Sequence, residues 1–359
     1  MVILMQEIVN IDGSYGEGGG QIYRNSLAYS AVVRRPVRIY NIRAKRSNPG
    51  LRPQHLTVLR ALAEITNARV EGASIGSREV IFKPQRIRGG KYRFDVGTAG
   101  SISLVLQGLI PALLFADRET DIEIRGGTDV KWSPPIDAIR FVLIPALRRL
   151  GADIEIDVIR RGHYPRGGGI VRVHIEPISK LKPILLMDQG KILRICGISH
   201  CVKLPAHVAK RQAESAKKFL EAKGFSVEIE TEYYEREKDP HLGPGSGIVL
   251  WAETTTNAIL EGDALGERGK PAEKVGEEAA RGLYEQISLG GAVDVHHTDQ
   301  LIIFMALADG ISKIKSSLIS MHTISAIYIA ERIVGAKFRI DGEHGKPGII
   351  HSEGIGLER

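Results

Sequence analysis

The sequence contains three copies of a unit in which the expected helices and strands follow one another in a similar order. This repetition constrains the fold more than any other feature. Each copy passes from a polar loop into an apolar helix, and then through a strand, a second helix and a β-hairpin. The polar loops are residues 16–21, 97–101 and 296–300. The later helices of the same three units end within residues 65–70, 150–154 and 334–338. Equivalent loops fall at equivalent places on packed units, so three polar loops can converge on one site. The units are too long and too few for a solenoid.

Length and composition favour a soluble protein of two domains. A chain of 359 residues with 43% hydrophobic residues can bury more than one core. The charged fraction of 25% is ordinary for a globular protein. The net charge of +7 and the pI near 9.3 favour a polyanionic partner, but they fit a basic enzyme without such a partner equally well.

Cysteine content and hydropathy indicate the compartment. Cys196 and Cys201 are too few for a disulfide framework and lack partners for a metal site, which indicates a reducing environment. Residues 1–5 have no basic flank, so they predict a first strand rather than a signal peptide. The longest apolar stretch, 102–116, is too short for a membrane span. We therefore expect a cytoplasmic protein with no membrane association.

The order of elements predicts an α/β (α+β) protein. Within each unit, short strands of alternating polarity separate and follow the helices, and the resulting β-α-β-α-β-β pattern implies helices packed on sheets. Residues 182–275 do not fit the repeat, because they carry a charged helix over 207–223 and a loop over 233–247 rich in charge, proline and glycine. We therefore expect a three-repeat domain formed by 1–181 and 276–359, interrupted by a smaller inserted α/β domain over 182–275.

The glycine-rich loop over 16–20 follows a strand and opens a helix. Its backbone N–H groups and the helix N-terminus can approach a phosphate closely. A glycine cluster is equally typical of a structural turn, and its spacing matches neither the dinucleotide fingerprint nor the P-loop. Glu17 within this loop suggests a bound cation, because a carboxylate beside phosphate-binding amides usually needs one between them. A solvated loop glutamate is the alternative.

The segment over 43–55 is the densest basic stretch of the chain. Its prolines and glycine predict a loop that ends at a helix N-terminus, with His55 at or near the cap. Guanidinium groups in such a loop can hold phosphate with two hydrogen bonds each. A solvated basic loop is the alternative.

The segment over 161–169 joins two strands of the second unit. A two-residue turn would be enough for a hairpin, yet this connection has nine residues with four glycines and two arginines. Such a loop fits a contact to a ligand and a close packing corner against another unit equally well.

Two histidine-bearing segments complete the set of candidate sites. His322 opens the last helix of the third unit, where the helix N-terminus can hold an anion, and its imidazole can attack phosphorus to form a phosphoramidate. A capping or core histidine is the alternative. His296 and His297 lie in a strand-like entry and should point to opposite faces, which argues against coordination of one metal by both. Thr298 and Asp299 have the composition of an ordinary helix N-cap.

Several of these segments, taken in order, resemble the RNA 3′-terminal phosphate cyclases, and the similarity runs essentially from end to end. The matching segments are 11–21, 49–51, 54–57, 97–101, 104–107, 126–129, 161–169, 299–301, and His322 with 331–332. Each segment alone is weakly specific, but all of them in this order are highly specific. The resemblance implies three repeats with the fold of a translation-initiation-factor C-terminal domain, plus a smaller inserted domain.

The resemblance also implies an activity, the ATP-dependent conversion of an RNA 3′-terminal phosphate to a 2′,3′-cyclic phosphate. In the family, a histidine attacks the α-phosphorus of ATP and releases pyrophosphate. The AMP then passes to the RNA 3′-phosphate, and the neighbouring 2′-hydroxyl displaces it. His322 occupies the position of the nucleophile. The implied partners are RNA with a 3′-terminal phosphate, ATP, and Mg²⁺ or Mn²⁺, and a homodimer is left open.

The other site residues are carried over from the family by position. Glu17 corresponds to the carboxylate near the metal and the triphosphate. The phosphate region corresponds to Arg24, Arg46, Gln54 and His55, and the nucleotide pocket to Gln107, Asp299 and Gln300. Where the family often has an aromatic residue three positions before the aspartate, this chain has His296, whose imidazole can still stack on adenine.

Two other functions stay open at this point. Cyclase-like proteins that serve in ribosome assembly share the fold but lack the nucleophilic histidine, so the presence of His322 argues against that role. Enolpyruvyl transferases have a distantly related repeated architecture, but they act on small acids, and the inserted domain and segment 161–169 argue against them. Of the three functions, only the cyclase predicts a covalent adduct on the protein.

Overall fold

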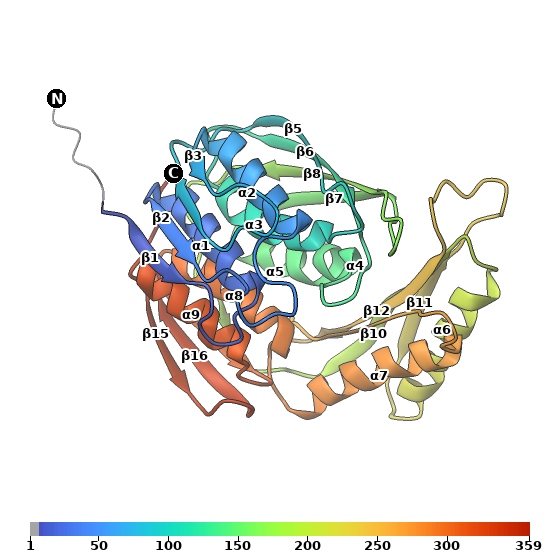
Figure 1. Ribbon diagram of the computed structural model, residues 1–359. Helices are drawn as coiled ribbons and strands as arrows, with labels where there is room; N and C mark the ends of the chain where they lie inside the picture. Colours follow the sequence, from blue (N-terminus) through green and yellow to red (C-terminus); the bar gives the residue numbers. More distant parts are fainter. Residues whose placement is uncertain (1–6) are drawn as a thin grey trace.

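The computed structural model describes residues 7–359 as a mixed α/β protein with four small sheets. The strand expected over residues 1–5 lies outside the described residues. Three of the sheets lie around a central group of helices, and the fourth lies to one side with two helices of its own (Figure 1). Within residues 7–359, no helix has the length and apolar character needed to cross a membrane.

The three sheets around the helices share one strand order. In each, the first strand of the unit pairs in parallel with the second, and the fourth strand pairs antiparallel with both the second and the third. The first unit consists of β1 (Val9–Asp12), α1 (Gly20–Val33), β2 (Val37–Tyr40), α2 (Pro53–Thr66), β3 (Arg69–Glu71) and β4 (Val80–Lys83).

The second and third units repeat this order with local differences. The second consists of β5 (Gly90–Asp95), α3 (Ile102–Leu113), β6 (Thr120–Gly126), a helix in three segments, β7 (Asp153–Arg160) and β8 (Gly169–Glu176). The three segments are α4 (Ile136–Ala138), the π-helical η1 (Ile139–Leu143) and α5 (Ile144–Arg149). The third consists of β9 (Leu185–Leu186), α8 (Val295–Leu307), β14 (Ile311–Ser316), α9 (Met321–Ile333), β15 (Lys337–Asp341) and β16 (Gly348–Glu353).

The fourth sheet interrupts the third unit between β9 and α8. Its elements are β10 (Ile192–Val202), α6 (His207–Glu221), β11 (Val227–Glu232), β12 (Gly245–Thr254), β13 (Glu261–Leu265) and α7 (Ala272–Ser288). The strand order is β11-β10-β12-β13, and α6 packs against α7. The boundary expected at residue 275 falls inside α7, and β9, expected in the inserted segment, pairs with β14 of the third sheet.

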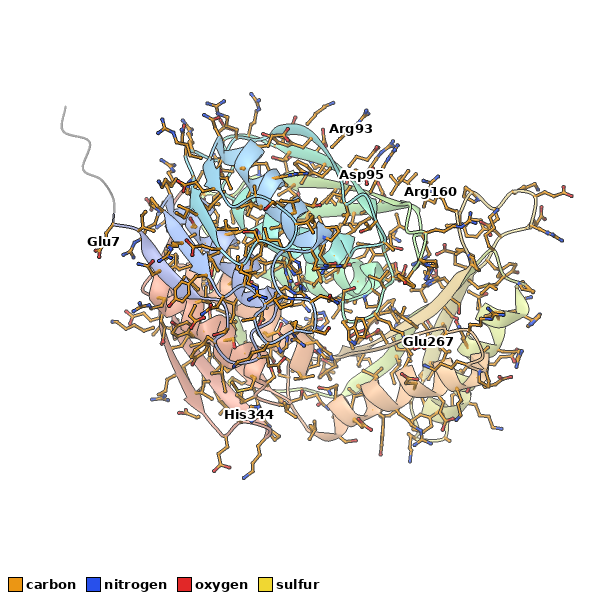
Figure 2. The ribbon with its side chains drawn as sticks, viewed as in Figure 1. Glu7, Arg93, Asp95, Arg160, Glu267 and His344 are labelled. Carbon is orange, nitrogen blue, oxygen red and sulfur yellow. The ribbon has the colours of Figure 1, made fainter. Side chains whose placement is uncertain are left out.

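Apolar helices explain why the three units hold together. The helix α3 is buried along nearly its whole length, and α1 contacts α2, α3 and α9, so one core joins all three units. Each Leu or Ile side chain buried in this way contributes about 1.5–3 kcal/mol. The fourth sheet meets this three-sheet body through the stacked rings of Phe141 and Trp251, whose centroids are 4.9 Å apart, and an ion pair of 2.8 Å between Lys131 and Glu267 (Glu267 is labelled in Figure 2).

Candidate functional site

The N-terminus of α9 presents His322 beside a carboxylate of the first unit. Ser320 caps this helix by accepting a hydrogen bond from the backbone N–H of Thr323, and His322 stands in the first turn. Its Nδ1 atom lies 3.2 Å from Oε1 of Glu17. A carboxylate only accepts hydrogen bonds, so this contact favours the tautomer with its proton on Nδ1. The lone pair on Nε2 is then free to act as a nucleophile.

The glycine-rich loop that carries Glu17 is held against α9 by close packing. Gly16 has a positive φ of 54°, and a Cβ at this position would overlap the hydroxyl of Ser325. The rings of Tyr15 and Tyr328 stack with centroids 4.0 Å apart. These contacts join a loop of the first unit to a helix of the third, and thereby place Glu17 next to His322.

Three cationic or polar side chains surround the N-terminus of α1. A Cβ at Gly19 would lie 3.1 Å from Nη2 of Arg46, and a Cβ at Gly20 would lie 3.0 Å from Nη1 of Arg24 and overlap Nε2 of His55. The N-cap residue Gly19 has no side chain to accept from the first backbone N–H groups of the helix. The free amides, the positive end of the helix dipole and the two guanidinium groups make this a binding site for an anion.

His55 faces this anion site as a neutral hydrogen-bond donor. Burial, together with the charges of Arg24, Arg43 and Arg52, lowers its pKa to about 3. Its Nδ1 accepts a hydrogen bond of 3.3 Å from the backbone N–H of Arg52, so the proton of the neutral ring belongs on Nε2. That Nε2–H group is the one that points toward Gly20.

Arg24 connects the anion site to the residues expected in the nucleotide pocket. Its Nη2 donates to Oε1 of Gln107 at 3.2 Å. Burial lowers the pKa of Arg24 to about 10, and attraction to Asp299 opposes this change. Burial raises the pKa of Asp299 to about 8, against the attraction of Arg24 and with the repulsion of Asp294. Near neutral pH, Asp299 therefore tends to hold a proton.

Gln107, Asp299 and Gln300 line one small cavity together with Gln21 and Asn25. Its volume is about 20 Å³, which is room for a water molecule and not for a purine ring. The Oε1 atom of Gln300 is buried there without a hydrogen-bond partner in the described part of the chain. The structure brings the three expected residues together, and the base would need these side chains to move apart before it could enter.

Gln54 and His296 were also expected at the site, but neither of them lines this small cavity. Oε1 of Gln54 accepts from the backbone N–H of Ser101 at 3.0 Å, so its oxygen fixes α2 to the start of α3. His296 lies in the first turn of α8, where burial of its ring lowers its pKa, against the charge of Asp294 and in the same direction as the charges of His297 and His322. The expected strand-like entry and the N-cap at Thr298 and Asp299 are wrong, because α8 begins at Val295 and Asp294 caps it by accepting from the amides of His296 and His297.

Glu17 is suited to share a divalent cation with a bound polyphosphate. Its side chain is about half exposed, and its Oε2 lies 3.6 Å from Nη2 of Arg46. Mg²⁺ prefers hard oxygen donors and usually takes one or two carboxylates together with substrate phosphates. Because ion pairs as exposed as those of Glu17 are weak, the carboxylate can leave Arg46 or His322 at low cost when ligands arrive.

The glycine-rich segment over 161–169 contains a buried network that the sequence did not reveal. The side chain of Arg161 is 2% exposed and lies 2.7 Å from Asp137, 2.6 Å from Glu232 and 3.5 Å from Asp129. Glu232 belongs to β11 of the fourth sheet, so this segment is a packing corner between the sheet and the three-sheet body. The signals in the sequence were the excess length of the hairpin connection and its glycines and arginines, which left a packing corner and a ligand contact equally open.

A protein-family model and the curated relatives agree on one family. A family model described as RNA 3′-terminal phosphate cyclase matches residues 15–340. A curated protein of that name from Staphylothermus marinus is 54% identical over 354 residues, which cover 98% of this chain and 99% of the relative. Relatives of the same name are 51% identical in Desulfurococcus amylolyticus, over 98% of this chain and 99% of the relative, and 49% identical in Methanopyrus kandleri, over 96% and 98%.

A solved structure of an enolpyruvyl transferase from Streptomyces tendae is a much weaker match. Its identity to this chain is 19% and its TM-score is 0.27, over 47% of this chain and 33% of that one. An EPSP synthase from Acinetobacter baumannii aligns at 12% identity with a TM-score of 0.25, over 97% of this chain and 65% of that one. Similarity at this level carries no argument about the activity of the chain.

Proposed function

The chain belongs to the RNA 3′-terminal phosphate cyclase family, and we propose that it converts the 3′-terminal phosphate of RNA to a 2′,3′-cyclic phosphate at the expense of ATP. The observation that carries this proposal is the contact of 3.2 Å between His322 Nδ1 and Glu17 at the N-terminus of α9. It supports an imidazole that directs Nδ1 at the carboxylate and leaves Nε2 to attack phosphorus.

The proposed reaction has three transfers at phosphorus. His322 Nε2 forms a bond to the α-phosphorus of ATP while the bond to pyrophosphate breaks. An oxygen of the RNA 3′-phosphate then attacks the same phosphorus and releases the imidazole. Finally the 2′-hydroxyl attacks the RNA phosphate, loses its proton, and displaces AMP. Dividing one difficult step into transfers with good leaving groups is the usual benefit of a covalent intermediate.

The N-terminus of α1 is proposed to bind the phosphates during these steps. Arg46 and Arg24 would offset the charge of the triphosphate, and the neutral Nε2–H of His55 would donate a hydrogen bond without adding charge. Glu17 would hold Mg²⁺ or Mn²⁺ together with phosphate oxygens, and such an ion supplies charge neutralisation at the reacting phosphorus. Gln54 would position the start of α3 rather than contact a phosphate directly.

The adenine pocket is proposed to form around Gln107, Asp299 and Gln300 once the cavity between them opens. His296 is near enough in the chain to stack on the base, since it stands one turn before Asp299 on α8. The protonated carboxyl of Asp299 could donate a hydrogen bond to a base nitrogen.

We also propose the domain division that the strand orders support. The three units with one common strand order would form a repeat domain with the fold of a translation-initiation-factor C-terminal domain. The fourth sheet with α6 and α7 would be an inserted domain that begins after β9 and ends before α8, a few residues later at its start and more than ten residues later at its end than the limits expected from the sequence.

The experiment that tests this function uses an oligoribonucleotide with a labelled 3′-phosphate. After incubation with ATP and Mg²⁺, a cyclised end resists phosphatase, whereas an unreacted end loses its label. The wild-type protein should protect the label, and His322→Ala should not. His344→Ala is the matched control, because His344 lies exposed on the outer hairpin of the third sheet (Figure 2). A label that stays sensitive to phosphatase with the wild-type protein contradicts the proposal.

A further inference from the structure

Three buried side chains of the kinds that bind metal ions meet where the fourth sheet touches the three-sheet body. Asp129 follows β6, His163 lies in the β7–β8 connection, and His200 is on β10 of the fourth sheet; they are 2%, 7% and 0% exposed. One ligand atom from each lies within 4.8 Å of the other two. We propose that these three side chains bind a divalent metal ion, with Zn²⁺ the best suited, and that this ion fastens the fourth sheet to the body.

The distances between the ligand atoms suit a tetrahedral ion. The Nε2 atoms of His163 and His200 are 3.2 Å apart. Two nitrogens bound to Zn²⁺ at about 2.0–2.1 Å with a tetrahedral angle lie about 3.3–3.4 Å from each other. The Oδ2 atom of Asp129 lies 3.9 Å from His200 Nε2, so it must approach by roughly half an ångström to complete the same geometry.

The charges around the three side chains favour a cation. Asp129, Asp137 and Glu232 surround the single guanidinium group of Arg161, which leaves more buried negative charge than positive charge. The Oδ1 atoms of Asp129 and Asp137 are buried and accept no hydrogen bond from any described residue. Of the three carboxylates, Asp129 is the farthest from Arg161, but its Oδ2 accepts a hydrogen bond of 2.6 Å from Thr128, so a metal ion would share this oxygen or bind the unpartnered Oδ1. A divalent ion would offset the excess charge.

Both histidines are in the protonation state that binds metals. Burial lowers the pKa of His163 and of His200, and the charge of Arg161 acts in the same direction on both, so both rings are neutral near pH 7. A simple N–H···N hydrogen bond between the two rings would also explain their distance of 3.2 Å. That arrangement, however, adds no positive charge to three carboxylates that share one guanidinium group.

A third histidine is the candidate for the remaining ligand position. His241, in the connection between β11 and β12, has its Nδ1 2.7 Å from Asp239, while its Nε2 is buried without a described partner. An imidazole held through Nδ1 by a carboxylate is the arrangement that usually orients a metal-binding histidine. Among the described residues, the group whose ligand atoms all lie within 4.8 Å of one another holds Asp129, His163 and His200 but not His241, so the ring of His241 would have to move toward the ion to complete its coordination.

The test measures bound metal rather than activity. The purified full-length protein is stripped with a chelator, reloaded with Zn²⁺, dialysed, and analysed for metal content. We expect about one zinc ion per chain in the wild type and at least a tenfold lower content in His163→Gln and His200→Gln. Glu17→Gln should keep the ion, because Glu17 belongs to the ATP site. His174→Gln should also keep it, because His174 belongs to a separate exposed cluster with Glu119 and Glu176.

Titration of the stripped wild type with Co²⁺ makes the test independent of how the variants fold. Tetrahedral Co²⁺ absorbs strongly in the visible range, and octahedral Co²⁺ absorbs weakly. Strong absorption that excess Zn²⁺ removes supports the site, as does a loss of zinc confined to His163→Gln and His200→Gln. A wild type that retains no zinc and gives no tetrahedral cobalt spectrum overturns the proposal. Zinc that is lost in Glu17→Gln or His174→Gln, or retained in both histidine variants, overturns it as well.

Discussion

His322 and Glu17 are in contact at 3.2 Å between Nδ1 and Oε1, although one opens a helix of the third unit and the other lies in a loop of the first. Neither residue is deeply buried, since their side chains are 40% and 44% exposed. The contact therefore adds little to stability, and its value lies in the orientation and tautomer of the imidazole. We propose that the covalent chemistry belongs to this one pair, although the three units share one strand order.

Glu17→Gln keeps the shape of the side chain and removes its charge. The amide no longer enforces the proton on Nδ1 and binds a cation poorly, so transfer of AMP to the protein should slow by about 10- to 100-fold. Single-turnover labelling with α-labelled ATP measures this rate. Glu343→Gln is the control, because Glu343 is exposed and contacts only Lys346 among the described residues. An unchanged rate in Glu17→Gln would show that the carboxylate has no part in the reaction.

Gly20→Ala should disturb the anion site while leaving the fold intact. A Cβ at this position overlaps His55 Nε2 and lies 3.0 Å from Arg24 Nη1, so both side chains must shift at a cost of about 1–3 kcal/mol. We expect weaker ATP binding, measured by calorimetry. Gly282→Ala is the control, since Gly282 lies in α7 with no atom within 4 Å of an added Cβ. That change should stabilise the helix by about 1 kcal/mol and leave ATP binding unaltered. Equal ATP affinity in Gly20→Ala and the wild type would contradict the anion site.

His55 gives stability a defined dependence on pH. Its pKa is about 3 in the folded protein and 6.5 ordinarily, so between these values the unfolded chain binds a proton that the folded chain does not. The contribution of neutral His55 to the free energy of unfolding is fully present above its ordinary pKa. Below that pKa this contribution is lost as the pH falls, by about 1.4 kcal/mol per pH unit. His55→Gln removes this contribution. The difference in unfolding free energy between the wild type and His55→Gln, measured in urea, should therefore shrink from about pH 7 to about pH 4. A difference that does not change with pH would mean that His55 is not buried as a neutral ring.

Arg161→Met tests the network between the fourth sheet and the body. The substitution leaves the carboxylates of Asp129 and Asp137 buried with no guanidinium beside them, and such a loss costs about 3–5 kcal/mol. Thermal or urea unfolding measures the effect. Arg93→Met is the control, because Arg93 lies exposed on β5 (Figure 2) and should change stability by less than about 0.5 kcal/mol. Similar stability of the two variants would contradict the role of Arg161.

The repeat could be predicted from the sequence because it rests on local patterns. Apolar runs of helical length and alternating strands recur in each unit, and the position of His322 at the start of a helix follows from that order. The residues of the anion site could be listed from the motifs, but their roles could not. The neutral state of His55, for example, depends on burial and on Arg24, Arg43 and Arg52, which the fold brings together.

Other features depend on contacts that no local pattern encodes. The start of α8 was placed too late because Thr298 and Asp299 look like a cap, whereas the true cap, Asp294, is buried and also bonds to the ring of His297. The partners of Arg161 come from three elements in two parts of the molecule, so its burial could not be read from segment 161–169. The domain boundary expected at residue 275 falls inside α7, whose buried residues pack against α6 and β13 of the fourth sheet.

The central claim is that His322 forms a covalent bond to AMP. The most direct measurement is mass spectrometry of the protein after incubation with ATP and Mg²⁺ in the absence of RNA, followed by identification of the modified peptide. The account predicts AMP on the peptide that contains His322, removed by acid, lost in His322→Ala and unchanged in His344→Ala. A wild-type protein that carries no AMP, or one that carries it on another residue, would contradict the account.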